Sequence, residues 1–186
     1  WWITQAWKDG ILVCAATGND NRSDGRTHRG LSYPALHPHV IAVGAMNRKD
    51  GRWSWSNYGQ GLSVVAPGVS IPTTTRAGVD PDEDLLANPG YTQVFSGTSA
   101  ATPHVAGLAA LLISAYPGLQ KKPDHIQRII EESAEELPGY SYTDYSHRRT
   151  RNGAIPKGRE DHTGFGLIKV MAALDHAAAE AAAGAF

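Results

Sequence analysis

The sequence predicts an α/β fold built on a mainly parallel sheet. Three short runs, residues 11–16, 40–44 and 62–66, are apolar at almost every position. Such runs are typical of strands that are buried on both faces, as parallel strands are. Helical patterns alternate with these runs, which is the usual sign of a parallel sheet covered by helices. With 186 residues, of which 41% are hydrophobic, the chain is long and apolar enough for one domain with a core.

A helix and a hairpin are the other elements expected in the first half of the chain. Residues 2–9 read as the end of a helix, and Gly10 follows as its C-cap. Residues 69–75 and 92–95 are predicted to pair as a hairpin around the polar segment 76–90.

The second half of the chain is predicted to be mainly helical. Residues 102–116 have apolar side chains at helical spacing, and their small residues make the helix slim enough to pack closely under a sheet. Residues 123–135 predict a second helix, and residues 138–163 an irregular polar excursion. A last helix is expected from about residue 168, and its alanine-rich end, residues 177–186, is expected to fray.

Charge and composition argue against several classes of partner. The 17 basic and 18 acidic residues nearly cancel, so we expect neither a nucleic acid nor an anionic membrane as partner. No apolar stretch approaches the roughly 18 residues that would suggest a membrane span. The single cysteine, Cys14, excludes an intrachain disulfide and is expected to be a small buried hydrophobic residue. Because the sequence starts at Trp1 in what reads as the middle of a helix, we expect it to derive from a longer chain.

Two stretches carry chemistry. Phe95–Gly107 predicts a strand, a glycine-bounded turn and a helix, with Ser99 at the helix N-terminus. Unpaired N–H groups and the positive end of the helix dipole suit a nucleophile there, although a serine that merely caps the helix is the common alternative. An α/β-hydrolase elbow is excluded, because Ala101 stands where G-x-S-x-G needs its second glycine. The second stretch predicts a buried strand that ends in Gly18 and Asn19, which by itself reads as an ordinary turn.

Together, these stretches resemble the subtilisin family of serine proteases. Residues 97–107 are similar to its nucleophile motif G-T-S-x-A-x-P-H-V-A-G, and residues 15–19 to its A-A-x-G-N. Further matches are V-I-A-V-G-A, S-x-S-N-Y-G, A-P-G-V and G-F-G-L-I, so the resemblance extends to about residue 176. It implies a three-layer αβα fold. Residues 1–186 would then be the C-terminal part of a single subtilisin-like peptidase domain that lacks its N-terminal strands.

The resemblance also implies roles for individual residues. Ser99 would be the attacking nucleophile, and the side chain of Asn19 would stabilise the oxyanion together with the Ser99 backbone N–H. Ala16 and Gly18 would line the pocket for the P1 side chain of the substrate, with Gly30 opposite them across a variable loop. His104 would be a packed, structural histidine and not the catalytic base.

The sequence lacks the family residues that transfer the proton of the serine nucleophile. A serine nucleophile needs a base and an orienting carboxylate, but the family's D-[ST]-G and H-G-[ST]-H motifs occur nowhere. We therefore expect the chain alone to be inactive, with one sheet edge and the Trp-rich first helix exposed, and the missing N-terminal half of the domain as its partner. The alternative is a non-catalytic pseudopeptidase, an interaction module on the same fold.

The resemblance implies peptide or protein substrates, no required cofactor and a secreted or extracellular location. Structural calcium is conceivable at an acidic loop, although a solvated charge cluster is the simpler interpretation because the spacing matches no defined calcium loop. The loop contains Asp80, Asp82, Glu83 and Asp84.

Overall fold

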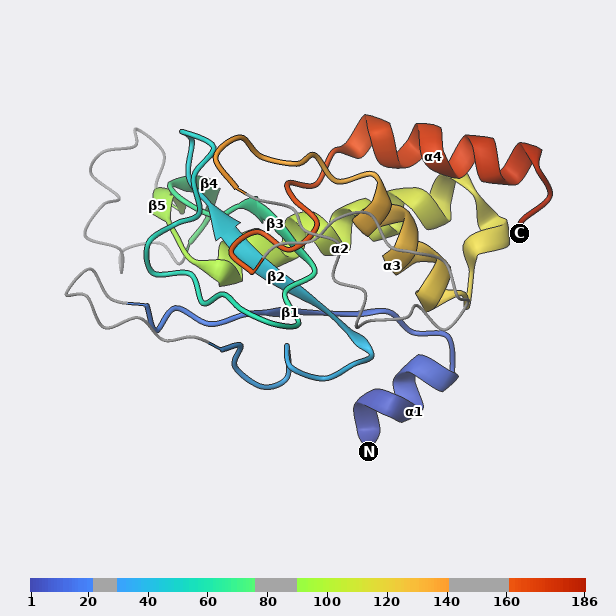
Figure 1. Ribbon diagram of the computed structural model, residues 1–186, viewed down its shortest axis with the longest axis horizontal. Coiled ribbons are helices and arrows are strands. Elements are labelled where there is room, and N and C mark those ends of the chain that lie inside the picture. The colour runs from blue at the N-terminus through green and yellow to red at the C-terminus, as the bar shows by residue number, and fades with distance from the viewer. Residues whose placement is uncertain (22–29, 76–89, 141–160) are drawn as a thin grey trace.

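A three-stranded parallel sheet forms the centre of the molecule in the computed structural model (Figure 1). The structure describes residues 1–21, 30–75, 90–140 and 161–186. The strands follow the order β1-β2-β3, with β1 at Val13–Ala16, β2 at Val40–Met46 and β3 at Val64–Pro67. The predicted α/β fold with a parallel sheet is therefore confirmed.

Burial differs between the strands because of their places in the sheet. β2 is central, pairs with both neighbours and is buried along its whole length. β1 pairs with β2 alone among the described strands, and only Ala15 in it is buried. The prediction that this first apolar run is buried on both faces is thus wrong, because β1 forms the edge of the described sheet.

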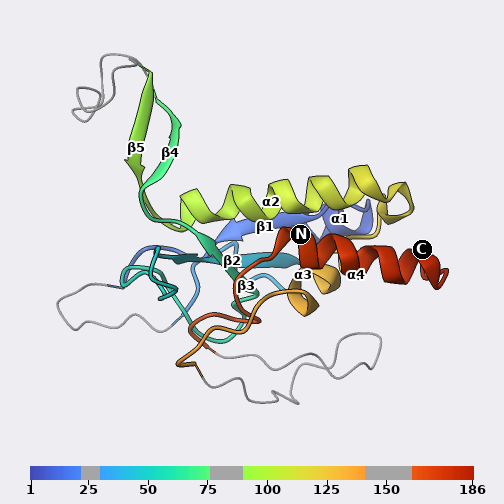
Figure 2. The same cartoon turned by 90° about the horizontal axis from the view of Figure 1, so that it is seen from above.

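Helices cover one face of the sheet. They are α2 at Thr98–Ala115, the short 3₁₀ helix η2 at Pro117–Leu119, α3 at Pro123–Glu132 and α4 at Val170–Ala182. α2 contacts all three strands and runs beside β1 in Figure 2. Its buried side chains Val105, Leu108 and Leu112 join Ile41 and Val43 of β2 in the main core.

The opposite face of the sheet carries a second, smaller apolar cluster. Val40, Ala42 and Val65 from the strands meet Leu31 and Leu62 from the loops there. Ile3 of α1, the helix at Trp2–Lys8, packs against this cluster. A residue of α1 therefore packs on the face opposite α2, α3 and α4, which agrees with the predicted three-layer αβα fold.

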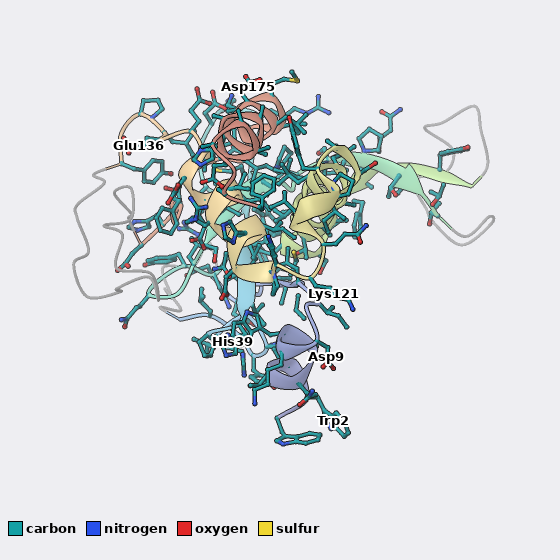
Figure 3. The ribbon with its side chains drawn as sticks, turned by 90° about the vertical axis from the view of Figure 1, so that its right-hand side faces the viewer. Trp2, Asp9, His39, Lys121, Glu136 and Asp175 are labelled. Atoms are coloured by element: carbon teal, nitrogen blue, oxygen red, sulfur yellow. The ribbon has the colours of Figure 1, made fainter. Side chains whose placement is uncertain are left out.

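α1 ends where the sequence predicts, and it packs only loosely against the rest of the chain. Gly10, with φ of +84°, follows it, and a Cβ there would lie 2.5 Å from the Lys121 Cα, so the close approach of these segments requires glycine. No residue of α1 is buried. Trp1 and Trp2 are 79% and 77% exposed, and Figure 3 shows Trp2 at the far end of the helix from Lys121. This confirms the expected exposure of the Trp-rich helix.

The predicted hairpin is present and extends away from the sheet (Figure 2). β4 at Ile71–Thr74 pairs antiparallel with β5 at Tyr91–Phe95. Val94 and Phe95 remain 44% and 41% exposed. β5 leads directly into the turn before α2, so the hairpin fixes the chain direction on the approach to Ser99.

α2 begins four residues before the predicted start at Thr102. Its 18 residues are long and apolar enough to cross a membrane by length and composition alone. The sequence prediction that no stretch approaches this length is wrong for α2, because serine, threonine and histidine interrupt its apolar residues without making it polar overall. Its buried face packs on the sheet, which is the position of a core helix.

The end of the chain is helical and makes packing contacts. α4 continues to Ala182, Ala177 is wholly buried, and the Phe186 ring contacts the Tyr116 ring edge-on at 6.2 Å. The fraying of residues 177–186 that composition predicts stays a prediction. Most of the expected polar excursion, residues 141–160, lies outside the described residues.

Candidate active site

The candidate site lies where the carboxyl end of β1 meets the N-terminus of α2. Thr98, the first residue of α2, joins the two segments. Its backbone N–H and its hydroxyl both donate to Asn19 Oδ1, at 3.0 and 2.9 Å. The Gly18 N–H donates in turn to Thr98 Oγ1 at 3.3 Å. These bonds cross 79 to 80 positions of sequence and hold the loop against the helix.

The same bonds orient the side chain of Asn19. Because Oδ1 accepts two hydrogen bonds, Nδ2 must point the other way, and no described residue accepts a bond from it. Asn19 is exposed. A Cβ on Gly97 would lie 3.2 Å from Nδ2, so the glycine leaves space beside this donor.

A second donor lies at the start of α2. The N–H groups of Ala100 and Ala101 donate to the Gly97 carbonyl at 3.0 and 3.2 Å, and that of Thr98 is taken by Asn19. The Ser99 N–H has no acceptor among the described residues, and Ser99 is exposed. Gly97 occupies the N-cap position and, as a glycine, has no side chain with which to cap the helix, so the side-chain acceptor in the first turn is Asn19. Ser99 therefore does not cap α2, and its hydroxyl remains available for another role.

Gly68 contacts and supports the turn that carries the Ser99 N–H donor. Its N–H donates to the Met46 carbonyl at 3.0 Å, and its own carbonyl accepts the Gly97 N–H at 2.7 Å. A Cβ at Gly68 would lie 2.7 Å from Ala45 Cβ and 2.8 Å from the Gly97 oxygen. The A-P-G-V segment thus packs directly under the G-T-S turn.

The predicted pocket residues lie in part beside Asn19. Ala16 ends β1, and Gly18, with φ of +104°, precedes Asn19 directly. The Gly30 N–H donates to the Tyr58 carbonyl at 2.9 Å, and no heavy atom lies within 4 Å of a Cβ placed on Gly30. The loop between them, residues 22–29, lies outside the described residues.

His104 differs from its predicted environment. It is exposed, because none of the described residues covers that side of α2, and its Nδ1 lies 2.9 Å from the Ala100 carbonyl. This distance makes Nδ1 the donor in the neutral ring. No described histidine is hydrogen-bonded to Ser99.

Cys14 is half-buried and not fully buried as predicted. It packs against the main core, and burial raises the pKa of its thiol to about 11. A thiol with such a pKa stays protonated at neutral pH and is a poor nucleophile.

No metal centre is found in the part of the chain that the structure describes, where no three His, Cys, Asp or Glu side chains converge. The acidic loop proposed for calcium lies at residues 80–84, outside the described ranges.

Two supporting residues escaped the sequence analysis. Thr98 orients Asn19, and Asn57 bonds to the loop on either side of it. The signal was present in the quoted G-T-S and S-x-S-N-Y-G motifs, but composition and spacing give such polar residues no role. Only their contacts do.

Comparison with known proteins identifies the family of the chain. Residues 1–166 match the model of the subtilase family. Over 177 residues the chain is 34% identical to the cell wall-associated protease of Bacillus subtilis (strain 168), covering 90% of this chain and 17% of that protein. Over 116 residues it is 45% identical to subtilisin NAT of Bacillus subtilis subsp. natto, covering 62% of this chain and 26% of that protein.

A solved structure shares the fold as well. The prenylagaramide maturation protease PagA superposes with a TM-score of 0.65 at 27% identity, covering 94% of this chain and 53% of that one. The chain therefore spans about half of that structure and about a quarter or less of the two curated relatives. On the family match and these relatives, the chain belongs to the subtilase family of serine peptidases.

Proposed function

We propose that this chain supplies the nucleophile and the oxyanion hole of a serine endopeptidase. Ser99 is the nucleophile, and its backbone N–H and Asn19 Nδ2 are the two oxyanion donors. The observation that carries the proposal is that both donors are exposed and lack an acceptor within the described chain, while every neighbouring donor at the start of α2 is already bonded. Donors held in this way stabilise a developing oxyanion without reorganising.

In the proposed reaction, Ser99 Oγ attacks the carbonyl carbon of the scissile peptide bond and its proton passes to a base. The carbonyl oxygen becomes an oxyanion that accepts hydrogen bonds from the Ser99 N–H and Asn19 Nδ2. Collapse of this intermediate expels the amine, which takes the proton from the base, and leaves an acyl-enzyme. Water, deprotonated by the same base, then attacks the ester carbonyl. The bond to Ser99 Oγ breaks, the base returns the proton to Oγ, and the acyl part of the substrate leaves as a carboxylic acid.

The substrate is a peptide or protein. Ala16 and Gly18 form one wall of the P1 pocket and Gly30 lies on the other side. Position 18 also requires glycine for a structural reason, because a Cβ there would lie 2.5 Å from Asn57 Nδ2. The reaction requires no cofactor, and calcium, where bound, is structural. As the name of one relative places that protein at the cell wall, we propose a secreted or extracellular location for this one.

The base and its carboxylate come, in this proposal, from the part of a subtilase domain that the chain does not span. Two unpartnered surfaces support such a partner. β1 has one edge without a described strand, and α2 turns an exposed face outward that includes Pro103, Gly107 and the 51% exposed Leu111. A strand edge and an adjoining apolar helix face are surfaces that proteins normally cover.

The test begins upstream of the Trp1 codon, where the reading frame should encode D-[ST]-G and H-G-[ST]-H motifs. The polypeptide encoded by the whole frame should then react with a fluorophosphonate probe at Ser99, and the 186-residue chain alone should not. Substitution Ser99→Ala should abolish the labelling. Asn19→Ala should lower kcat by about 10²–10³, a magnitude that itself derives from subtilisin.

The outcome separates the two candidate functions. The proposed peptidase activity would be refuted by a reading frame without the two motifs. It would also be refuted if the whole polypeptide were labelled equally with and without Ser99→Ala, or not labelled at all. Either result would favour the non-catalytic interaction module. The observation that supports this alternative is that no described residue supplies a base for Ser99.

A further inference from the structure

Asn57 is wholly buried beneath the oxyanion loop and bonds to it repeatedly. Its backbone N–H donates to the Gly18 carbonyl at 2.9 Å. Its side-chain Oδ1 accepts the Asp20 N–H at 2.9 Å, and its Nδ2 donates to the Asp20 carboxylate at 2.8 Å. Its carbonyl accepts the Thr17 hydroxyl at 3.2 Å. Asn57 thus contacts the residues on both sides of Asn19.

Two of these bonds act on the peptide groups that flank Asn19. The Gly18 carbonyl belongs to the peptide bond before Asn19, and the Asp20 N–H belongs to the peptide bond after it. A bond to each of these planes fixes both backbone dihedral angles of Asn19, because the planes rotate about its Cα. Thr98 holds the side-chain oxygen of Asn19 and leaves its backbone untouched. The two residues therefore restrain different parts of the same donor.

We propose that Asn57 is the positioning residue of the oxyanion donor: it holds the main chain of Asn19 so that Nδ2 stays directed at the substrate. The catalytic consequence rests on the proposed function, while the positioning itself is a property of the folded chain. A misplacement of about 1 Å in a catalytic group can cost about 10²-fold in rate, so a restraint on the backbone of Asn19 has functional weight.

Only an amide side chain satisfies this position. Oδ1 must accept the Asp20 N–H while Nδ2 donates to the Asp20 carboxylate. Alanine or serine would leave the Asp20 N–H without its acceptor. Aspartate would keep the acceptor but set two carboxylates at hydrogen-bond distance, where they repel unless one is protonated.

The test is amide hydrogen exchange in the 186-residue chain, measured by NMR for the wild type and Asn57→Ser. The reporter is the Thr98 N–H, because its acceptor is Asn19 Oδ1. The reference is the Ala101 N–H in the same helical turn, whose acceptor is the Gly97 carbonyl. We expect exchange at Thr98 to accelerate about five- to tenfold relative to Ala101, the equivalent of one net hydrogen bond.

The matched control is Asn21→Ser. Asn21 is also buried, and its Nδ2 donates to the Ser56 carbonyl at 2.9 Å, but it bonds to neither peptide group that flanks Asn19. It should lower global stability by a similar amount and leave the ratio of Thr98 to Ala101 exchange unchanged. Equal ratios for Asn57→Ser and the wild type, or the same change in both variants, would overturn the proposal.

Asn57→Asp adds a readout that a general packing role would not produce. Asp20 is the charged side chain that residue 57 contacts among the described residues. Protection at Thr98 should be lost at neutral pH and regained as the pH is lowered, when a shared proton removes the repulsion between the carboxylates. Protection that does not depend on pH would contradict the assigned contacts.

In the whole polypeptide, Asn57→Ser should lower kcat about tenfold or more with little change in KM. An inactive wild type would refute the proposed function but leave the exchange result standing. An active wild type with unchanged kcat in Asn57→Ser would instead refute the positioning role.

Discussion

Gly68→Ala tests whether the A-P-G-V segment supports the G-T-S turn by close contact. The added Cβ would lie 2.7 Å from Ala45 Cβ, 2.8 Å from the Gly97 oxygen and 3.2 Å from Ala101 Cβ. Carbon atoms pack at about 3.5 Å or more, so the first contact is about 0.8 Å too short. Ala45 and Ala101 are wholly buried, and none of the three atoms is the end of a flexible side chain. The backbone itself must move.

Overpacking of this kind typically costs about 1–3 kcal/mol. We expect about 2–3 kcal/mol here, because a strand and a helix both resist the displacement, and Tm should fall by about 4–12 °C at this chain length. The assay is urea denaturation followed by tryptophan fluorescence. The slope of the transition should stay constant, so that the change in midpoint reports stability.

Gly107→Ala is the matched control, because it makes the same chemical change at a glycine with open space beside it. Gly107 lies inside α2, and no heavy atom lies within 4 Å of a Cβ placed there. Alanine should stabilise the chain by about 0.5–1 kcal/mol through helix propensity. A Gly68→Ala variant within 0.5 kcal/mol of the wild type, or equal losses in both variants, would refute the packing argument.

Two further predictions concern titratable groups. Burial raises the pKa of the Cys14 thiol to about 11. At pH 8 this thiol should therefore react with iodoacetamide about a hundredfold more slowly in the folded chain than in the urea-unfolded chain. Equal rates in the two states would contradict the packing of Cys14 under α2. Burial of Glu180 raises the pKa of its carboxyl, but the hydrogen bond and charge of Arg128, with His176, outweigh burial and leave the pKa lowered. Glu180→Gln should therefore lower the free energy of unfolding by about 1 kcal/mol at pH 7. The difference in unfolding free energy between wild type and Glu180→Gln should disappear as the pH falls from about 4.3, the pKa of an unfolded Glu, through the lower pKa of the folded state. A difference that persists at pH 2.5 would show that the charge of Glu180 is not its cause.

Local patterns predicted the elements of this fold well. Apolar runs gave the parallel strands, and the glycine-bounded turn correctly placed Ser99 at the start of a helix. The start of α2 was predicted too late, because the acceptor that caps Thr98 is Asn19, 79 positions away. A helix that is capped by a distant side chain carries no signal in its own first turn.

Burial was harder to predict than secondary structure. His104 and β1 have the sequence of interior segments, yet both are partly uncovered in the described structure. Sequence reports the hydrophobicity of a segment, whereas burial also depends on which other segments lie over it. The role of Asn57 was hidden for a related reason, because its contacts join residues that are 37 to 40 positions apart.

The two halves of the proposed chemistry differ in what they require from a partner. The contacts described for the oxyanion donors, from Thr98, Gly97, Gly68 and Asn57, all come from within this chain. Electrostatic preorganisation at Asn19 and Ser99 should therefore exist before any partner arrives. Proton transfer needs a base that no described residue provides. Association with a partner should thus change the reactivity of Ser99 by orders of magnitude and leave the exchange protection of the Thr98 N–H nearly unchanged. A Thr98 N–H that became protected only on association would mean that the partner builds the oxyanion hole as well.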